Sequence, residues 1–144
     1  MRKIMIVDDN YLSAEGIEKN IDWEVLNAEI VHICYNGTSA IDAMKKEPVD
    51  LIISDIEMPD LDGISMSRQA LDINPMVKII LISAYDKFEY ARRALLLGAL
   101  DYIEKPLDYA YLIQKVKNAF ALMEREQKNL QLLKQSRPLL IEKF

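Results

Sequence analysis

The sequence predicts an α/β protein in which one parallel sheet is wound with helices on both of its faces. Five short runs rich in Ile and Val alternate along the chain with longer amphipathic segments. The runs are apolar on both faces, which is typical of parallel strands that are covered by helices. The chain has 144 residues, of which 51% are hydrophobic and 28% charged, so it suffices for about one globular domain.

The apolar runs locate the strands of this doubly wound sheet. Right-handed crossovers between parallel strands then restrict the topology to a few arrangements. In such sheets ligands bind beyond the carboxyl ends of the strands, where the direction of winding reverses. The predicted strands are Lys3–Val7, Ala28–Cys34, Leu51–Ser54, Val77–Ser83 and Leu100–Ile103.

Helices are predicted from capping residues at their starts and from glycine or proline after their ends. The apolar positions of the last two helices recur at helical spacing and therefore define one buried face on each. The predicted helices are Leu12–Asn20, one from a Thr38 cap through Met44, one from Gly63 that ends before Pro75, one from an Asp86 cap to Gly98, and one from Asp108 through Met123.

The chain after Met123 keeps a helical composition but loses the wide apolar stripe of the preceding turns. We therefore expect one globular domain at residues 1–122 and a helical linker at 123–144, with Pro138 ending the helix. Leu130 and Leu133 continue a thin apolar seam, so contact with a partner helix is the alternative. A further domain is expected beyond this tail.

Polar side chains stand at four of the predicted strand ends. Asp8 and Asp9 follow the first strand, Asp55 the third, Ser83 the fourth and Lys105 the fifth. Carboxylates that converge on one point suit Mg²⁺, which prefers carboxylate oxygens, water and phosphate. A hydroxyl and an ammonium at the same point would bind phosphoryl oxygens, so the set suits phosphoryl transfer.

Four segments carry a resemblance to a known family. The stretches "VDDN", "SDIEMPDLDG", "LISAY" and "DYIEKP" occur in the order and spacing of response-regulator receiver domains of two-component signalling. The chain resembles this family over residues 2 to 122. The resemblance implies a flavodoxin-like sheet with strand order 2-1-3-4-5, in which the first and third strands are neighbours.

The resemblance also implies a role for each site residue. Asp55 would accept a phosphoryl group from a sensor histidine kinase. Asp9, Asp55 and the main-chain carbonyl of Glu57 would bind Mg²⁺ directly, and Asp8 would act mainly through water. Lys105 would pair with Asp55 before transfer and with the phosphoryl group afterwards.

Further residues would pass the signal on. Ser83 would move to hydrogen-bond the phosphoryl group, and the ring of Tyr102 would turn inward into the vacated space. Glu57 and Tyr85 would tune the lifetime of the phosphoryl group, and a cis peptide before Pro106 would aim Lys105 inward. The chain would then catalyse only its own phosphorylation and dephosphorylation, and would not be an enzyme for external substrates.

Composition and charge limit the classes of partner that this chain is expected to bind. The net charge is −5 and no stretch is rich in Lys or Arg, so we expect no nucleic acid on this chain. DNA would be bound by an absent output domain, which the resemblance suggests is of AraC type in a transcription regulator. A single cysteine, Cys34, no signal-peptide pattern and only short apolar runs favour the cytoplasm and no membrane contact. A homodimer would use the fourth helix, fifth strand and fifth helix, or the C-terminal helix.

Two other functions are compatible with parts of the pattern. The first is a Mg²⁺-dependent phosphohydrolase that forms an aspartyl phosphate on an external substrate, although the sequence leaves no room for a cap over the substrate. The second is a receiver that works only as a dimerisation module without phosphorylation. The presence of Asp8, Asp9, Asp55, Ser83 and Lys105 together favours the phosphorylated receiver over both.

Overall fold

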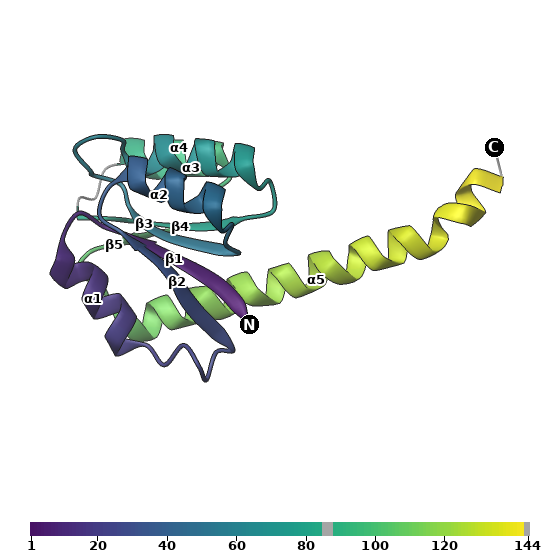
Figure 1. Ribbon diagram of the computed structural model, residues 1–144, viewed down its shortest axis with the longest axis horizontal. Helices are drawn as coiled ribbons and strands as arrows, with labels where there is room; N and C mark the ends of the chain where they lie inside the picture. Colours follow the sequence, from purple (N-terminus) through teal and green to yellow (C-terminus); the bar gives the residue numbers. More distant parts are fainter. Residues whose placement is uncertain (85–87, 143–144) are drawn as a thin grey trace.

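The computed structural model describes residues 1–84 and 88–142 and confirms the predicted fold class (Figure 1). All strand pairs in this part of the chain are parallel, and the sheet order is β2-β1-β3-β4-β5. Helices α2, α3 and α4 cover one face of the sheet, and α1 and α5 cover the other. The elements are β1 (Arg2–Val7), α1 (Tyr11–Asn20), β2 (Ala28–Cys34), α2 (Gly37–Lys46), β3 (Leu51–Asp55), α3 (Gly63–Ile73), β4 (Lys78–Ser83), α4 (Phe88–Leu97), β5 (Asp101–Glu104) and α5 (Tyr109–Glu142).

Each face of the sheet has its own apolar core. Met5 and Ile52 point to the face that α2, α3 and α4 cover, whereas Ile4, Ile6 and Ile53 point to the face of α1 and α5. All five side chains are at most 1% exposed. The near-continuous apolar strands of the sequence are thus explained by burial on both faces.

The strands begin and end within one residue of their predicted bounds, but the start of α2 was predicted wrongly. Asn36, and not Thr38, caps this helix: its Oδ1 accepts a hydrogen bond from the Ser39 amide at 2.7 Å. Gly37 is the first residue of the helix, and a Cβ at this position would stand 2.4 Å from the carbonyl oxygen of Leu61. The predicted Asp86 cap lies outside the described residues.

Helix α5 runs from Tyr109 to Glu142 and leaves the body of the protein in its second half (Figure 1). The prediction that Pro138 ends the helix is wrong, because a proline removes one backbone hydrogen bond while the neighbouring ones can continue the helix. Met123 is 5% exposed and belongs to the core, whereas the side chains of residues 128–135 are exposed. Within the described ranges, no helix combines the length and apolar character needed to span a bilayer.

Candidate functional site

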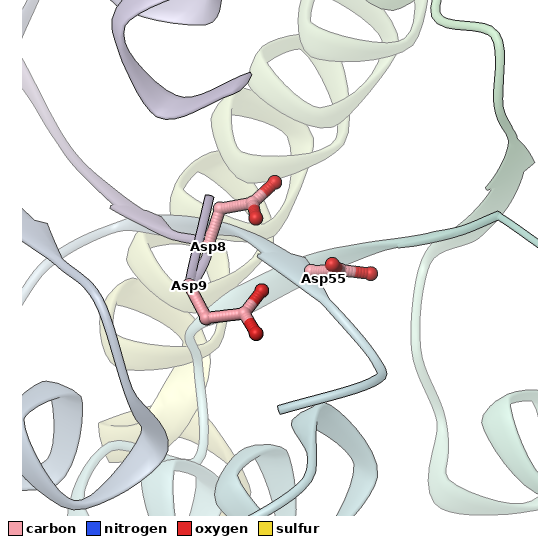
Figure 2. Close-up of side chains that lie close together, drawn as sticks. All are labelled: Asp8, Asp9 and Asp55. Atoms are coloured by element: carbon pink, nitrogen blue, oxygen red, sulfur yellow. The ribbon is translucent and has the colours of Figure 1, made fainter. Parts of the chain in front are cut away.

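Three carboxylates converge at the carboxyl edge of the sheet (Figure 2). Asp55 is the last residue of β3, and Asp8 and Asp9 directly follow β1. Because β1 and β3 are neighbours with Val7 opposite Ser54, the three side chains emerge side by side. Each offers an oxygen that lies within 4.8 Å of the other two.

Two of these carboxylates are held in an unfavourable environment. Asp8 is 3% and Asp55 8% exposed, whereas Asp9 is exposed. Burial raises the pKa of both Asp8 and Asp55, and each has a further carboxylate nearby that raises it more. The positive charge of Lys105 lowers both pKa values, but both remain above the ordinary aspartate value. The site therefore favours an additional positive charge.

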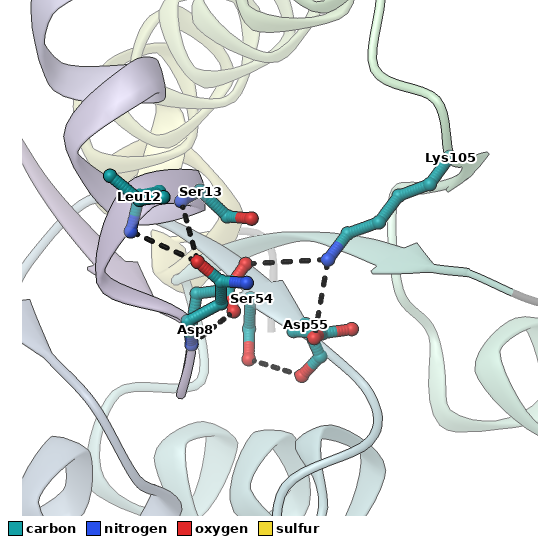
Figure 3. A network of polar contacts seen from close by, with 7 residues as sticks. Asp8, Leu12, Ser13, Ser54, Asp55 and Lys105 are labelled. Carbon is teal, nitrogen blue, oxygen red and sulfur yellow. Dashed lines mark hydrogen bonds and ion pairs between the residues drawn. The ribbon is translucent and has the colours of Figure 1, made fainter.

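Lys105 approaches the carboxylates from the end of β5 (Figure 3). Its Nζ lies 3.5 Å from Asp8 Oδ2 and 3.4 Å from Asp55 Oδ2. Its backbone amide donates to the carbonyl oxygen of Ser83 at 2.8 Å, which fixes the root of the side chain against β4. The peptide bond between Lys105 and Pro106 is cis, as the resemblance implied.

Ser83 lies on β4, the neighbour of β3, and Tyr102 lies on β5, the edge strand on the far side of β4. Ser83 is fully buried at the end of β4, one residue beyond the position opposite Asp55. Tyr102 is half-buried on β5 and packs against the core under α2, α3 and α4. Its position at the edge of the sheet places it in a shallow hollow that Pro106 and Tyr111 also line.

Backbone contacts fix the Asp8 side chain. Asp8 Oδ1 accepts a hydrogen bond from the Asn10 amide at 2.9 Å. Asn10 Oδ1 in turn accepts from Leu12 and Ser13 at 2.9 and 3.1 Å and so caps α1 (Figure 3). The sequence reasoning did not assign Asn10, although an asparagine before an amphipathic helix is a recognisable capping signal.

A groove opens from the carboxylates between the β3–α3 loop and α4. Asp9, Glu57 and Met58 line one side of it, and Tyr90 and Arg93 of α4 line the other. Glu57 therefore lines this groove, whereas Tyr85 lies outside the described residues. The sequence did not single out Tyr90 and Arg93, because helical spacing alone cannot tell a residue that lines a groove from one that only covers the sheet.

The donor set fits a hard divalent cation. Within the part of the chain described here, the cluster that could hold a metal consists of carboxylates alone, and oxygen ligands of this kind suit Mg²⁺ and not zinc. His32 is engaged elsewhere, since its Nε2 lies 2.9 Å from the carbonyl oxygen of Glu47. Asp8, Asp9 and Asp55 could thus hold Mg²⁺ next to a lysine.

A five-stranded sheet of this order, with carboxylates and a lysine at its carboxyl edge, is the arrangement of a signalling receiver. Residues 4–117 match the family model of the response regulator receiver domain, and the chain belongs to this family. The relatives include the transcriptional regulatory protein YesN of Bacillus subtilis, 29% identical over 126 residues that cover 88% of this chain and 34% of that protein. HptR of Staphylococcus aureus, also a transcriptional regulatory protein, is 32% identical over 114 residues, 78% of this chain and 44% of that protein. The chain thus spans less than half the length of these relatives.

Comparison with solved structures supports the same family. The receiver domain of AraT, a response regulator from Geobacillus stearothermophilus, superposes with a TM-score of 0.82 and 34% identity, covering 88% of this chain and 98% of that one. A two-component transcriptional regulator, AraC, from Clostridium phytofermentans gives a TM-score of 0.79 and 29% identity, with 90% and 99% coverage.

Proposed function

We propose that this receiver accepts a phosphoryl group on Asp55 from a sensor histidine kinase and thereby controls a transcription regulator. The observation that carries the proposal is the position of Asp55: its carboxylate is buried at a strand end, beside Asp8 and Asp9 and 3.4 Å from the Lys105 ammonium. The names of the relatives support transcription control. The proposal includes a sensor histidine kinase as the phosphoryl donor, an output domain of AraC type and a cytoplasmic location for the protein.

The transfer follows from the charges around Asp55. An oxygen of the Asp55 carboxylate forms a bond to phosphorus while the bond between phosphorus and the kinase imidazole nitrogen breaks, and the imidazole leaves with its electron pair. Asp9, Asp55 and the main-chain carbonyl of Glu57 would hold Mg²⁺, with Asp8 acting through water. Bound Mg²⁺ would neutralise the charge that gathers on the phosphoryl oxygens. Lys105 pairs with Asp55 before transfer and with a phosphoryl oxygen afterwards.

The response would travel along β4 and β5. The new phosphoryl group adds negative charge and strong acceptors at the strand end. The hydroxyl of Ser83 then donates a hydrogen bond to this group. Tyr102 then turns into the space that Ser83 leaves, and the surface of α4, β5 and α5 changes. A homodimer through this surface or through the second half of α5 would carry the signal to the output domain. The chain would act catalytically only on its own phosphoryl group.

Phosphorylation of the purified chain tests the proposal. We expect incubation with Mg²⁺ and acetyl phosphate to add one acid-stable, base-labile phosphoryl group, detected by intact mass. The adduct should disappear in Asp55→Asn and in the presence of a chelator, and it should persist in Asp72→Asn, which removes an exposed carboxylate of α3. An unmodified protein with a native circular dichroism spectrum would contradict the proposal.

Lys105 has a separate test. Lys105→Ala should leave Mg²⁺ binding in place, because the carboxylates remain, but should uncouple phosphorylation from the movement of Tyr102. The amide and ring NMR signals of Tyr102, compared with and without beryllofluoride, report that movement. Equal shifts in the variant and the native protein would refute the role of Lys105 in this step.

A further inference from the structure

The loop after Asp55, residues 56–62, carries the Glu57 carbonyl of the proposed cation site. Hydrogen bonds hold this loop at both of its ends. The amide of Ile56 donates to Ile82 of β4 at 2.9 Å, and the Gly63 amide donates back to the Ile56 carbonyl at 2.8 Å. At the other end, Asp62 caps α3 by accepting from the Ser65 amide at 2.8 Å. These contacts fix the two ends of the loop but not its middle.

The middle of the loop is held by Asp60, which lies on the first turn of α2. Asp60 Oδ1 accepts from the Gly37 amide at 3.3 Å, and Oδ2 accepts from the Thr38 amide at 3.2 Å. These amides belong to the first turn of a helix, where backbone donors have no partner within the helix. Hydrogen bonds from the Thr38 side chain, and then from the backbone amides of Leu61, Thr38 and Asp60 itself, lower the pKa of Asp60 to about 2.

The loop backbone also packs directly on this turn. A Cβ on Gly37 would stand 2.4 Å from the Leu61 carbonyl oxygen and 2.7 Å from the Leu61 Cβ. Only glycine therefore allows Asp60 and Leu61 to approach the helix this closely. Asp60 and Gly37 form a matched contact between two segments that are far apart in the sequence.

The same segment holds the other half of the carboxylate site. The Asp8 amide donates to the carbonyl oxygen of Cys34, the last residue of β2, at 3.0 Å. Residues 34–38 therefore connect with the β1 end, which carries Asp8 and Asp9, and with the loop that carries Glu57. This short piece of backbone therefore links the two halves, in addition to the direct pairing of β1 with β3.

We propose that Asp60 is a positioning residue for the divalent cation: by binding the first turn of α2, its carboxylate sets the separation between Asp9 and the Glu57 carbonyl. Asp60 itself touches neither the cation nor the phosphoryl group. The inference rests on the proposed function, since it needs the cation. Groups that hydrogen-bond a metal ligand directly change metal affinity about 10- to 100-fold when they are removed, and Asp60 acts one step further away, so about tenfold is the upper limit of the effect expected.

Titration calorimetry with MgCl₂ at pH 7 measures this effect. We expect Asp60→Ala to weaken Mg²⁺ binding several-fold, up to about tenfold, and Asp60→Asn to recover part of the loss because its amide oxygen still accepts a backbone hydrogen bond. Asp72→Ala removes the same charge from an exposed position on α3 and should bind Mg²⁺ like the native chain. Thr38→Val, which removes only the hydroxyl, should give a smaller loss than Asp60→Ala.

Two further measurements separate positioning from simple stabilisation. In the metal-free protein, the amide proton signals of Gly37 and Thr38 should move in Asp60→Ala, while thermal unfolding in EDTA shows that the variant is folded at the temperature of the titration. Unchanged Mg²⁺ affinity with a lower melting temperature would overturn the inference and leave the proposed function intact. Failure of the native chain to bind Mg²⁺ would overturn both. If Asp60→Ala does not fold, native-like affinity in Thr38→Val and Asp60→Asn would count against the inference.

Discussion

At the scale of single residues, the buried carboxylates Asp8 and Asp55 oppose folding at neutral pH. Their pKa values are raised by burial, so the folded state binds their protons more tightly than the unfolded chain does. The stability contributed by their protonated forms is complete below about pH 4, the ordinary aspartate value, and is lost as the pH rises through the raised values. Asp60 has a lowered pKa of about 2, so its contribution is present above about pH 4 and is lost as the pH falls towards 2.

Asp55→Asn therefore should stabilise the metal-free protein at pH 7. A gain of about 1 kcal/mol would raise the melting temperature by about 3–6 °C, and the difference from the native chain should shrink as the pH is lowered towards 4. Calorimetric melting in EDTA across this range measures it. Adding Mg²⁺ should stabilise the native chain more than the variant, because only binding to the folded state contributes. A variant that melts lower than the native chain at pH 7 in EDTA would disprove this view of Asp55.

At the scale of elements, the β3–α3 loop depends on Gly63. A Cβ at this position would stand 2.2 Å from the Asp55 carbonyl oxygen and 2.9 Å from the Ile56 Cα, which are backbone atoms that cannot move aside alone. Gly63→Ala should cost about 1–3 kcal/mol in the free energy of unfolding and should also slow phosphorylation of Asp55. Urea unfolding and the rate of acetyl phosphate labelling measure the two effects.

Gly98→Ala provides the matched control for Gly63. Gly98 has φ +93° and open space around its Cβ position, so the substitution strains the backbone without pushing on the site. It should destabilise the protein yet leave the labelling rate of the folded molecules unchanged. Equal labelling rates for Gly63→Ala and Gly98→Ala would show that the loop tolerates the shift.

Helix α1 carries a second close contact through a glycine. A Cβ on Gly16 would stand 2.4 Å from the hydroxyl oxygen of Tyr109, at the first turn of α5. Gly16→Ala should therefore realise little of the helix-propensity gain of about 1 kcal/mol. In a Tyr109→Phe background the hydroxyl is absent, and the same substitution should stabilise the protein. A double-mutant cycle by urea unfolding measures this coupling, and additive effects would exclude it.

The strands could be predicted because apolar runs define buried strands, and the carboxyl ends of parallel strands share one edge of the sheet. The resemblance to receiver domains added the strand order that makes the first and third strands neighbours, so Asp9 and Asp55 were expected to converge. The Asn36 cap is also local, since Asn36 accepts from Ser39 three residues on, and it was missed because Thr38 was chosen as the cap in its place. The Asp60 contact and the groove beside Arg93 could not be predicted in this way. Each depends on how a loop approaches a helix that is distant in the sequence, and a short acidic turn such as "MPDLDG" does not specify its partner.

At the scale of the whole molecule, the long helix α5 is attached to the body beyond its last core residue. Glu126 Oε1 lies 2.8 Å from Lys78 Nζ, and the two side chains are 30% and 15% exposed. Arg2, the first residue of β1, donates to the side chain of Gln127 at 3.4 Å. Lys78 begins β4, and Ser83 ends it. The strand that carries Ser83 at the site therefore contacts α5 at its opposite end.

Glu126→Gln should loosen this attachment without disturbing the site. Because the ion pair is partly buried, we expect a loss of about 1 kcal/mol in the free energy of unfolding, together with faster amide hydrogen exchange in residues 124–135 and unchanged exchange in the central strands. The matched control is Glu124→Gln, whose pair with Lys128 has a longer distance of 3.6 Å and side chains 65% and 70% exposed. That substitution should change stability by less than about 0.5 kcal/mol. If both variants exchange alike, the Lys78 contact does not hold the helix against β4.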